Sequence, residues 1–263
     1  MKSNDRTGSI PTVRIGMIGL GNVGSGVYEI LCGRFGQTAA SLPTMSKGFT
    51  HPSLPFFEIS KICIRDPTKP RSVLINKDRT TLTTDINDII NDDEIDIVIE
   101  VMGGEISSIE LAKEAVLRSL KNGKSVVSAN TSLIARHLDE IRGATLEGDG
   151  SNHTYFAYEA AVCGGIPIIQ TMQGCYSGDI IHEVIGICNG ATTFMLEKME
   201  EDRTDGFEIL KEAQELGYND PTSDTEVHEV REKISILAKL VRTRSSYLSF
   251  NLKPSSQYVQ INL

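Results

Sequence analysis

Apolar and polar positions follow two different periods in the first half of the chain. Short apolar runs typical of buried strands lie at residues 13–18, 57–64, 95–101 and 124–128. Residues 107–122 and 133–141 instead carry apolar positions at helical spacing, and Gly123 follows the first of them as a C-terminal cap. Strands that alternate with helices of this length predict an α/β fold with a doubly wound parallel sheet.

The pattern changes after about residue 150. Residues 155–158 and 180–187 are typical of strands, and residues 207–216 and 229–241 of helices. Small residues between positions 160 and 167 predict a loop, as do the Ser, Thr, Gly and Pro residues of positions 36–55. No internal repeat is visible. The second half is therefore expected to form a separate domain of mixed strands and helices.

The first predicted strand leads directly into Gly19-Leu20-Gly21-Asn22-Val23-Gly24, and a helix-like segment follows to about Leu31. Gly-x-Gly-x-x-Gly between a strand and a helix is the layout of the turn that holds a dinucleotide pyrophosphate in Rossmann-type domains. Gly19 permits the sharp turn, Gly21 lets backbone N–H groups approach the phosphates, and Gly24 lets the helix pack on the strand. The helix N-terminus adds N–H donors and a positive dipole end. These residues predict a site for NAD or NADP.

Three segments follow from these patterns. Residues 1–150 are predicted to be an NAD(P)-binding Rossmann domain, and residues 151–245 a mixed α+β domain that binds substrate or forms a dimer. Residues 246–263, which are polar and Ser-rich, are predicted to form a separate C-terminal tail.

Composition excludes several classes of partner. The formal net charge of −9 disfavours binding to nucleic acid or to an anionic membrane. No apolar run is long enough to span a bilayer, and residues 1–11 lack the apolar core of a secretory signal. The scattered, odd set of cysteines predicts reduced thiols and a cytoplasmic location: Cys32, Cys63, Cys163, Cys175 and Cys188. Targeting to an organelle stays open, because residues 1–14 are basic and contain Ser and Thr.

Arg65-Asp66 lies at the end of the second predicted strand, where a Rossmann enzyme binds the adenosine ribose. An acidic side chain on the 2′-OH selects NAD, whereas a nearby arginine accommodates the 2′-phosphate of NADP. Both types occur here, and Lys69 and Arg71 follow. The segment favours NADP or dual use, and an ordinary solvated basic loop is the alternative.

Two further segments carry candidate chemistry. Asn189 to Thr193 follows a predicted strand, at the strand end where α/β proteins bind ligands, although a capped turn into a helix explains it equally well. Asp220 and Asp224 flank a turn before the last predicted helix. On that helix Glu229 and Lys233 have i,i+4 spacing, which by itself is typical of a surface salt bridge.

The chain resembles the homoserine dehydrogenase family from about Val13 to Leu240. The motifs occur in the family's order: the glycine turn, Arg65-Asp66 with Lys69-Pro70-Arg71, Glu100-Val101-Met102-Gly103-Gly104, Ser128-Ala129-Asn130, Glu159-Ala160-Ala161-Val162, Gly164-Gly165-Ile166-Pro167, Gly186-Ile187-Cys188-Asn189-Gly190, Ala213-Gln214-Glu215-Leu216-Gly217-Tyr218, Asp220-Pro221-Thr222 and Lys233.

The resemblance implies the reversible NAD(P)-dependent interconversion of L-homoserine and L-aspartate 4-semialdehyde, in the biosynthesis of threonine, methionine and isoleucine. Lys233 would stabilise the developing alkoxide and supply its proton while the cofactor supplies hydride, with Glu229 and Asp224 as neighbouring carboxylates. A homodimer is also implied.

The resemblance assigns further residues to binding sites. It assigns Gly103 and Asn130 to the cofactor site, in addition to the glycine turn, Arg65, Asp66 and Lys69. Substrate contacts fall to Gly190, Thr192, Tyr218, Asp220 and Asp224. Glu159, with backbone carbonyls near Val162 and Gly164, matches a site for a monovalent cation such as sodium.

Several positions depart from the family pattern. Thr131 replaces a second lysine, and a threonine cannot replace a cation at a developing oxyanion. Only Asn219 separates Tyr218 from Asp220, where the family carries a substrate-binding glutamate. Other departures are Ala191, Val227 and Glu229, which replaces an aspartate. The tail is unlike the family segment that completes the Rossmann domain, so part of the sheet is expected to be incomplete or finished by a partner chain.

Three readings follow. The first is a working homoserine dehydrogenase that uses Lys233. The second is a catalytically degenerate paralogue that still binds dinucleotide or dimerises, supported by Thr131 and the shortened loop. The third is a related oxidoreductase acting on another small amino acid or semialdehyde.

Overall fold

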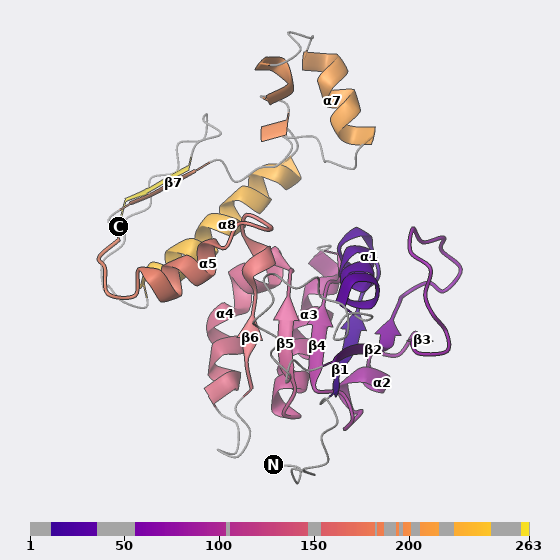
Figure 1. The fold of residues 1–263 in the computed structure, drawn as a ribbon. Coiled ribbons are helices and arrows are strands. Elements are labelled where there is room, and N and C mark those ends of the chain that lie inside the picture. The colour runs from indigo at the N-terminus through magenta and orange to yellow at the C-terminus, as the bar shows by residue number, and fades with distance from the viewer. Residues whose placement is uncertain are drawn as a thin grey trace, which may run out of the picture. The chain divides into compact units, whose positions relative to one another are not determined.

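The computed structural model describes residues 12–35, 56–103, 106–146, 154–181, 183–186, 193–194, 197–200, 206–215, 224–242 and 259–262. The chain divides into two compact units, coloured along the sequence in Figure 1. The first unit comprises residues 1–133 and 137–157, and the second comprises residues 134–136 and 158–263.

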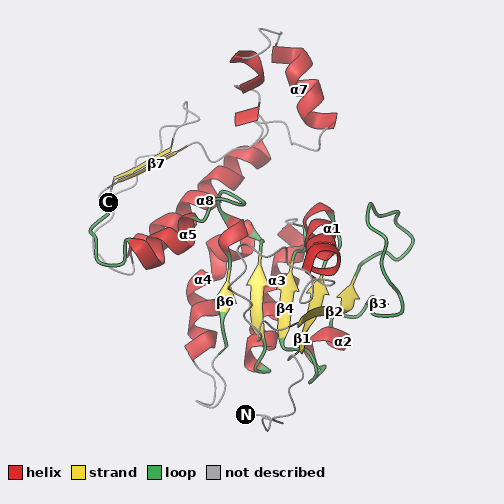
Figure 2. Cartoon of the chain, in the orientation of Figure 1, coloured by secondary structure: helices red, strands yellow, loops and turns green. Residues whose placement is uncertain are grey.

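A parallel six-stranded sheet, drawn in yellow in Figure 2, forms the centre of the first unit. Its strands are β1 (Thr12–Ile18), β2 (Phe56–Cys63), β3 (Thr81–Thr83), β4 (Ile97–Glu100), β5 (Ser125–Ser128) and β6 (Phe156–Ala157). The order β3-β2-β1-β4-β5-β6 reverses direction between β1 and β4, which is the topological switch point of a Rossmann fold. The predicted doubly wound parallel sheet is therefore confirmed.

The helices of this unit match the predicted ones and add a short one. They are α1 (Asn22–Glu29), continued by the π-helix η1 (Ile30–Phe35), α2 (Asn87–Ile90), α3 (Ile106–Lys121) and α4 (Thr131–Leu146). Gly123 has φ +77°, as expected of a residue that ends a helix. Helix α4 begins earlier than predicted because the Asn130 side chain accepts the Leu133 N–H at 3.1 Å and caps the helix.

Two apolar clusters cover opposite faces of this sheet. Successive residues along a strand join different clusters, as Met17 and Ile18 do on β1. One cluster packs side chains of α3 and α4 on the sheet, and the other packs Tyr28 of α1 on it. Val126 of β5 belongs to the cluster under α3 and α4, whereas Val127, which points to the opposite face, remains 40% exposed. That face of β5 is therefore less completely covered.

The second unit contains helices and a small antiparallel sheet. Its elements are η2 (Glu159–Ala161), α5 (Ile168–Gln170), the π-helix η3 (Thr171–Cys175), β7 (Glu183–Gly186), α7 (Gly206–Glu215), α8 (Asp224–Arg242) and β8 (Val259–Asn262). Strand β8 lies in the predicted tail and pairs with β7 in antiparallel register, Glu183 opposite Asn262. The predicted helix at 229–241 is confirmed, and it begins five residues earlier, at Asp224.

Two structural findings bear on the predictions about the cysteines and about membrane-spanning segments. The described cysteines are free thiols, namely Cys32, Cys63, Cys163 and Cys175, while Cys188 lies outside the described residues. Burial raises the pKa of the Cys63 thiol, as expected of an inert core residue. Among the described helices, none has both the length and the apolar character needed to cross a bilayer.

An ion pair on β2 predicts a pH-dependent contribution to stability. Lys61 Nζ lies 2.8 Å from Asp92 Oδ2, and this hydrogen bond lowers the pKa of Asp92. The stabilisation is present above the ordinary Asp pKa of about 3.9 and is lost as the pH falls through the lowered value. Asp92→Asn is expected to reduce the free energy of unfolding by about 1 kcal/mol at pH 7, with the difference shrinking towards pH 3.

Urea unfolding at both pH values measures this difference. Asp93→Asn is the matched control, because Asp93 is exposed and its substitution removes the same charge at the next position. A loss of stability at Asp92→Asn that persists unchanged in acid would contradict the assignment.

Candidate active site

Two glycines of the β1–α1 turn are required by packing. Gly19 has φ +106°, and its N–H donates to the Cys63 carbonyl at 2.9 Å. A Cβ on Gly19 would lie 2.5 Å from the Val101 carbonyl oxygen, and one on Gly24 would lie 2.7 Å from the Gly19 carbonyl oxygen. Both contacts are with backbone, which cannot move aside as a flexible side chain does. The turn therefore lies directly against the ends of β2 and β4.

Gly21 differs from its two neighbours in the motif. A Cβ on Gly21 would meet no atom within 4 Å, so the fold itself leaves room for a side chain there. Gly21 precedes α1, and no side chain caps this helix end. Asn22 and Val23 are exposed, and the first N–H groups of a helix have no intrahelical acceptor. This end of α1 has the open backbone and donors that a pyrophosphate requires.

The predicted cofactor residues gather at one edge of the sheet. Gly19 follows β1, Arg65 follows β2, Gly103 follows β4 and Asn130 follows β5. Because these strands are parallel, their carboxyl ends meet at the same edge, where α/β proteins bind their ligands. The edge includes the switch point between β1 and β4.

The loop after β2 is closed by its own side chains. Asp66 Oδ1 accepts the Thr68 hydroxyl at 2.7 Å and the Thr68 N–H at 2.8 Å. These hydrogen bonds lower the pKa of Asp66. Arg71 donates to the carbonyls of Lys69 at 2.7 Å and Asp66 at 2.9 Å. Thr68 thus engages Oδ1 of the carboxylate that would bind an NAD ribose, while Arg71 holds the backbone of the loop. Sequence reasoning missed both roles.

Glu100, at the end of β4, is a buried carboxylate to which sequence reasoning assigned no role. It is 0% exposed, and its carboxylate accepts from Ser128 Oγ at 2.5 Å, Met102 N at 2.9 Å and Asn130 Nδ2 at 3.4 Å. Burial raises the pKa of Glu100, and the three hydrogen bonds oppose that effect. The available signal was an acidic residue that ends a buried strand, followed by Ser and Asn at the end of the next strand.

Asn130 is tied into the fold by both ends of its side chain. Its Oδ1 caps α4, its Nδ2 donates to Glu100, and its backbone N–H donates to Ser128 Oγ at 3.1 Å. The residue is only 5% exposed. A cofactor contact from Asn130 would therefore fall to its backbone or to its second amide hydrogen.

The second unit holds the predicted catalytic pair. Lys233 Nζ lies 2.7 Å from Glu229 Oε1 on α8, and the side chains are 14% and 37% exposed. This confirms the i,i+4 ion pair and shows that the lysine side chain is the more buried of the two. Asp224 is the first residue of α8, but its side chain lies outside the described residues. Four predicted substrate residues also lie outside them: Gly190, Thr192, Tyr218 and Asp220.

The predicted cation-binding segment contains an unusual turn. Glu159 accepts the N–H groups of Ile169 at 2.8 Å and Gln170 at 2.9 Å, which ties it to the start of α5. Cys163 and Gly164 both lie in the left-handed region, with φ +60° and +55°. This conformation costs a non-glycine residue about 1–2 kcal/mol. An all-oxygen set from Glu159 and nearby carbonyls suits a hard cation, and Glu159 retains lone pairs for one.

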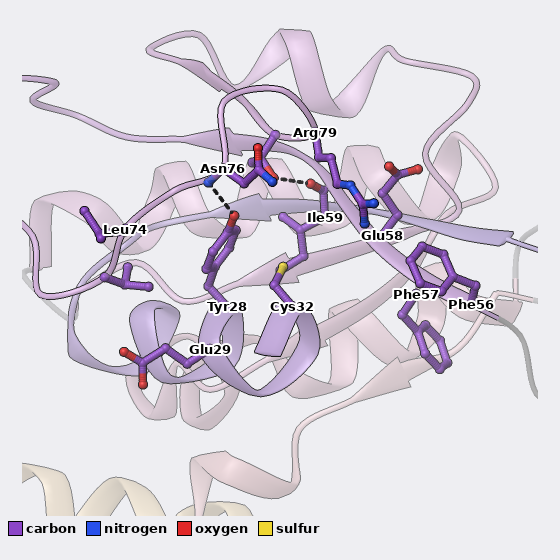
Figure 3. Close-up of a pocket in the computed structure, with 12 residues that line it drawn as sticks. Tyr28, Glu29, Cys32, Phe56, Phe57, Glu58, Ile59, Leu74, Asn76 and Arg79 are labelled. Atoms are coloured by element: carbon purple, nitrogen blue, oxygen red, sulfur yellow. Dashed lines mark hydrogen bonds between the residues drawn. The ribbon is translucent and has the colours of Figure 1, made fainter. Parts of the chain in front are cut away.

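A hollow of about 790 Å³ lies beside the amino-terminal half of β2 (Figure 3). Phe56, Phe57, Tyr28 and Arg79 are among its lining residues, and the Tyr28 hydroxyl accepts the Asn76 N–H at 2.9 Å. None of the predicted site residues lines it. The hollow therefore does not belong to the edge of the sheet where the glycine turn lies.

Comparisons with known proteins agree with this architecture. Residues 19–154 match the family model of the homoserine dehydrogenase NAD-binding domain, and residues 167–258 match that of homoserine dehydrogenase. The chain is 38% identical to homoserine dehydrogenase from Synechocystis sp. over 231 residues, which covers 87% of this chain and 48% of the relative. It is 37% identical to the Bacillus subtilis enzyme over 230 residues, with coverage of 87% and 48%.

Solved structures give the same result. A homoserine dehydrogenase from Thiobacillus denitrificans superposes with a TM-score of 0.67 at 32% identity, covering 89% of this chain and 49% of that one. The chain thus spans about half the length of the relatives it matches. With a family model that covers residues 19–154 and a Rossmann fold that carries its glycine turn, this chain belongs to the homoserine dehydrogenase family.

Proposed function

We propose that this chain takes part in the NAD(P)-dependent interconversion of L-homoserine and L-aspartate 4-semialdehyde. The observation that carries the proposal is the glycine turn at the switch point, in which Gly21 leaves open space before an uncapped helix. The matched relatives are named for this activity and support the substrate assignment.

The first unit would bind the dinucleotide. The N–H groups at the start of α1, with Gly21, Asn22 and Val23, would hold the pyrophosphate. Gly103 and Asn130 follow the neighbouring strands and would flank the nicotinamide half, which supplies or accepts the hydride when bound. We also assign the loop after β2 to the adenosine ribose, and favour NADP because Asp66 is engaged by Thr68 while Arg65 and Lys69 are cationic.

Lys233 would act on the reacting oxygen. Reduction of the aldehyde places negative charge on that oxygen, which an ammonium stabilises and protonates. Glu229 accepts from the Lys233 ammonium and so restricts its position. Asp224 begins the same helix and would supply a second carboxylate. Substrate contacts are assigned to Gly190, Thr192, Tyr218 and Asp220 from the family motif.

A monovalent cation would be held by Glu159 and by carbonyls near Val162 and Gly164. The support is the left-handed turn at Cys163, because a strained backbone persists where the surrounding structure or a function requires it. The cation would fix the shape of this turn.

We further propose a cytoplasmic homodimer. The dimer is supported by the sheet of β7 and β8, which has two strands among the described residues, since such a sheet is marginally stable and gains from further strands. A second copy of this chain would supply them.

Thr131 favours a second candidate, a paralogue that binds dinucleotide without turnover. It stands at the first position of α4, where the family motif carries a second lysine. The candidates differ in catalysis and agree in cofactor binding, so one enzyme assay separates them.

Lys233→Ala is expected to lower the rate of NADPH oxidation with L-aspartate 4-semialdehyde by about 100-fold or more, because one developing charge loses its cation. The affinity for NADPH is expected to stay unchanged. Lys211→Ala, which removes an exposed lysine of α7, is the control and keeps full activity. A wild-type protein that binds NADPH but shows no turnover would instead support the paralogue, and full activity of Lys233→Ala would contradict the assigned role.

Arg65→Ala is expected to weaken NADPH binding roughly tenfold while NADH binding changes little, since a charged hydrogen bond contributes about 1.5–3 kcal/mol. Fluorescence titrations with both dinucleotides measure the ratio. Lys77→Ala removes an exposed cation elsewhere in the unit and should leave the ratio unchanged. Equal weakening of both dinucleotides by Arg65→Ala would argue against recognition of a 2′-phosphate.

A further inference from the structure

The Glu100 carboxylate is buried in the centre of the cofactor edge, yet the proposed chemistry gives it no role. It pairs in register with Ile18 of β1 and Ser128 of β5, so it lies on the strand beside the switch point. Burying a carboxylate is costly unless hydrogen bonds compensate it, and an apolar side chain in such a position is often at least as stable. Stability of the sheet alone therefore does not explain an acidic residue here.

The contacts of Glu100 join two separate loops. Met102 N–H belongs to the segment that leads from β4 to Gly103, and Asn130 Nδ2 belongs to the turn that leads from β5 into α4. Both donate to the same oxygen, Oε1, while Ser128 Oγ donates to Oε2. The backbone adds one more link, from Ala129 N–H to the Glu100 carbonyl at 3.2 Å. One residue thus sets the spacing of the two loops that follow β4 and β5.

We infer that Glu100 is a positioning residue of the dinucleotide site, which holds the loops of Gly103 and Asn130 in place for the nicotinamide half. The inference rests on the proposed dinucleotide binding of the first unit. Glu100 acts through the loops and does not itself touch the cofactor, because its side chain is fully buried and its oxygens face Met102, Ser128 and Asn130.

Two substitutions at Glu100 distinguish the effect of its hydrogen bonds to the two loops from the effect of its negative charge. Glu100→Met keeps the length of the side chain but removes the acceptors of all three donors. Glu100→Gln keeps an oxygen for Met102 and Asn130, and its new amide can donate to Ser128 Oγ, since a hydroxyl both donates and accepts. Glu100→Met is expected to weaken NADPH binding roughly tenfold, whereas Glu100→Gln stays within about threefold of the wild type.

A matched control separates binding from general stability. The Thr80 hydroxyl is buried and donates to the Ile59 carbonyl at 2.8 Å, away from the cofactor edge. Thr80→Val also removes a buried hydrogen bond, so it is expected to lower the unfolding temperature and leave NADPH binding unchanged. Fluorescence titration of NADPH and thermal unfolding, performed on the whole chain for each variant, give both quantities.

Ser128→Ala provides a second test that does not depend on the folding of Glu100→Met. It removes one donor to Glu100 and the acceptor of the Asn130 N–H, so NADPH binding is expected to weaken in the same direction. Wild-type affinity in both Glu100→Met and Ser128→Ala would overturn the inference, as would a loss in Glu100→Gln equal to that in Glu100→Met. A wild-type protein that binds no dinucleotide would contradict the proposed function itself.

Discussion

The close approach of backbone at Gly19 is the constraint on which the cofactor edge depends. The turn donates a hydrogen bond to the end of β2 and lies against the end of β4, with no room for a Cβ before the Val101 carbonyl. These contacts fix where α1 begins relative to the sheet. Because α1 begins there, its first N–H groups lie at the switch point between β1 and β4.

The three glycines of the Gly-x-Gly-x-x-Gly motif are required for different reasons. A side chain on Gly19 or Gly24 would collide with backbone, so these residues are required for folding. A Cβ on Gly21 would meet no atom of the described residues within 4 Å, so packing among them does not require glycine there. The proposed pyrophosphate would supply a reason, because it approaches the backbone at a helix N-terminus and a side chain on Gly21 would stand in its way.

The sequence predicted the longer elements because their periodicity extends over several turns or strand residues, as in α3 and β2. It missed β3 and α2, which have three and four residues and are too short to show a period. It also missed Glu100, because the contact with Ser128 arises from the register of two strands. Thr68 was within reach of sequence reasoning, since Asp and Thr two residues apart commonly form a local turn.

The affinity of Gly21→Ala for NADPH tests the central claim most directly. The account predicts an unfolding temperature equal to that of the wild type, since the new methyl group has open space, together with binding weakened by about tenfold or more. Gly26→Ala, a change of the same kind within α1 that also has open space, should keep wild-type affinity. Unchanged binding in Gly21→Ala would contradict the assignment of this turn to the pyrophosphate.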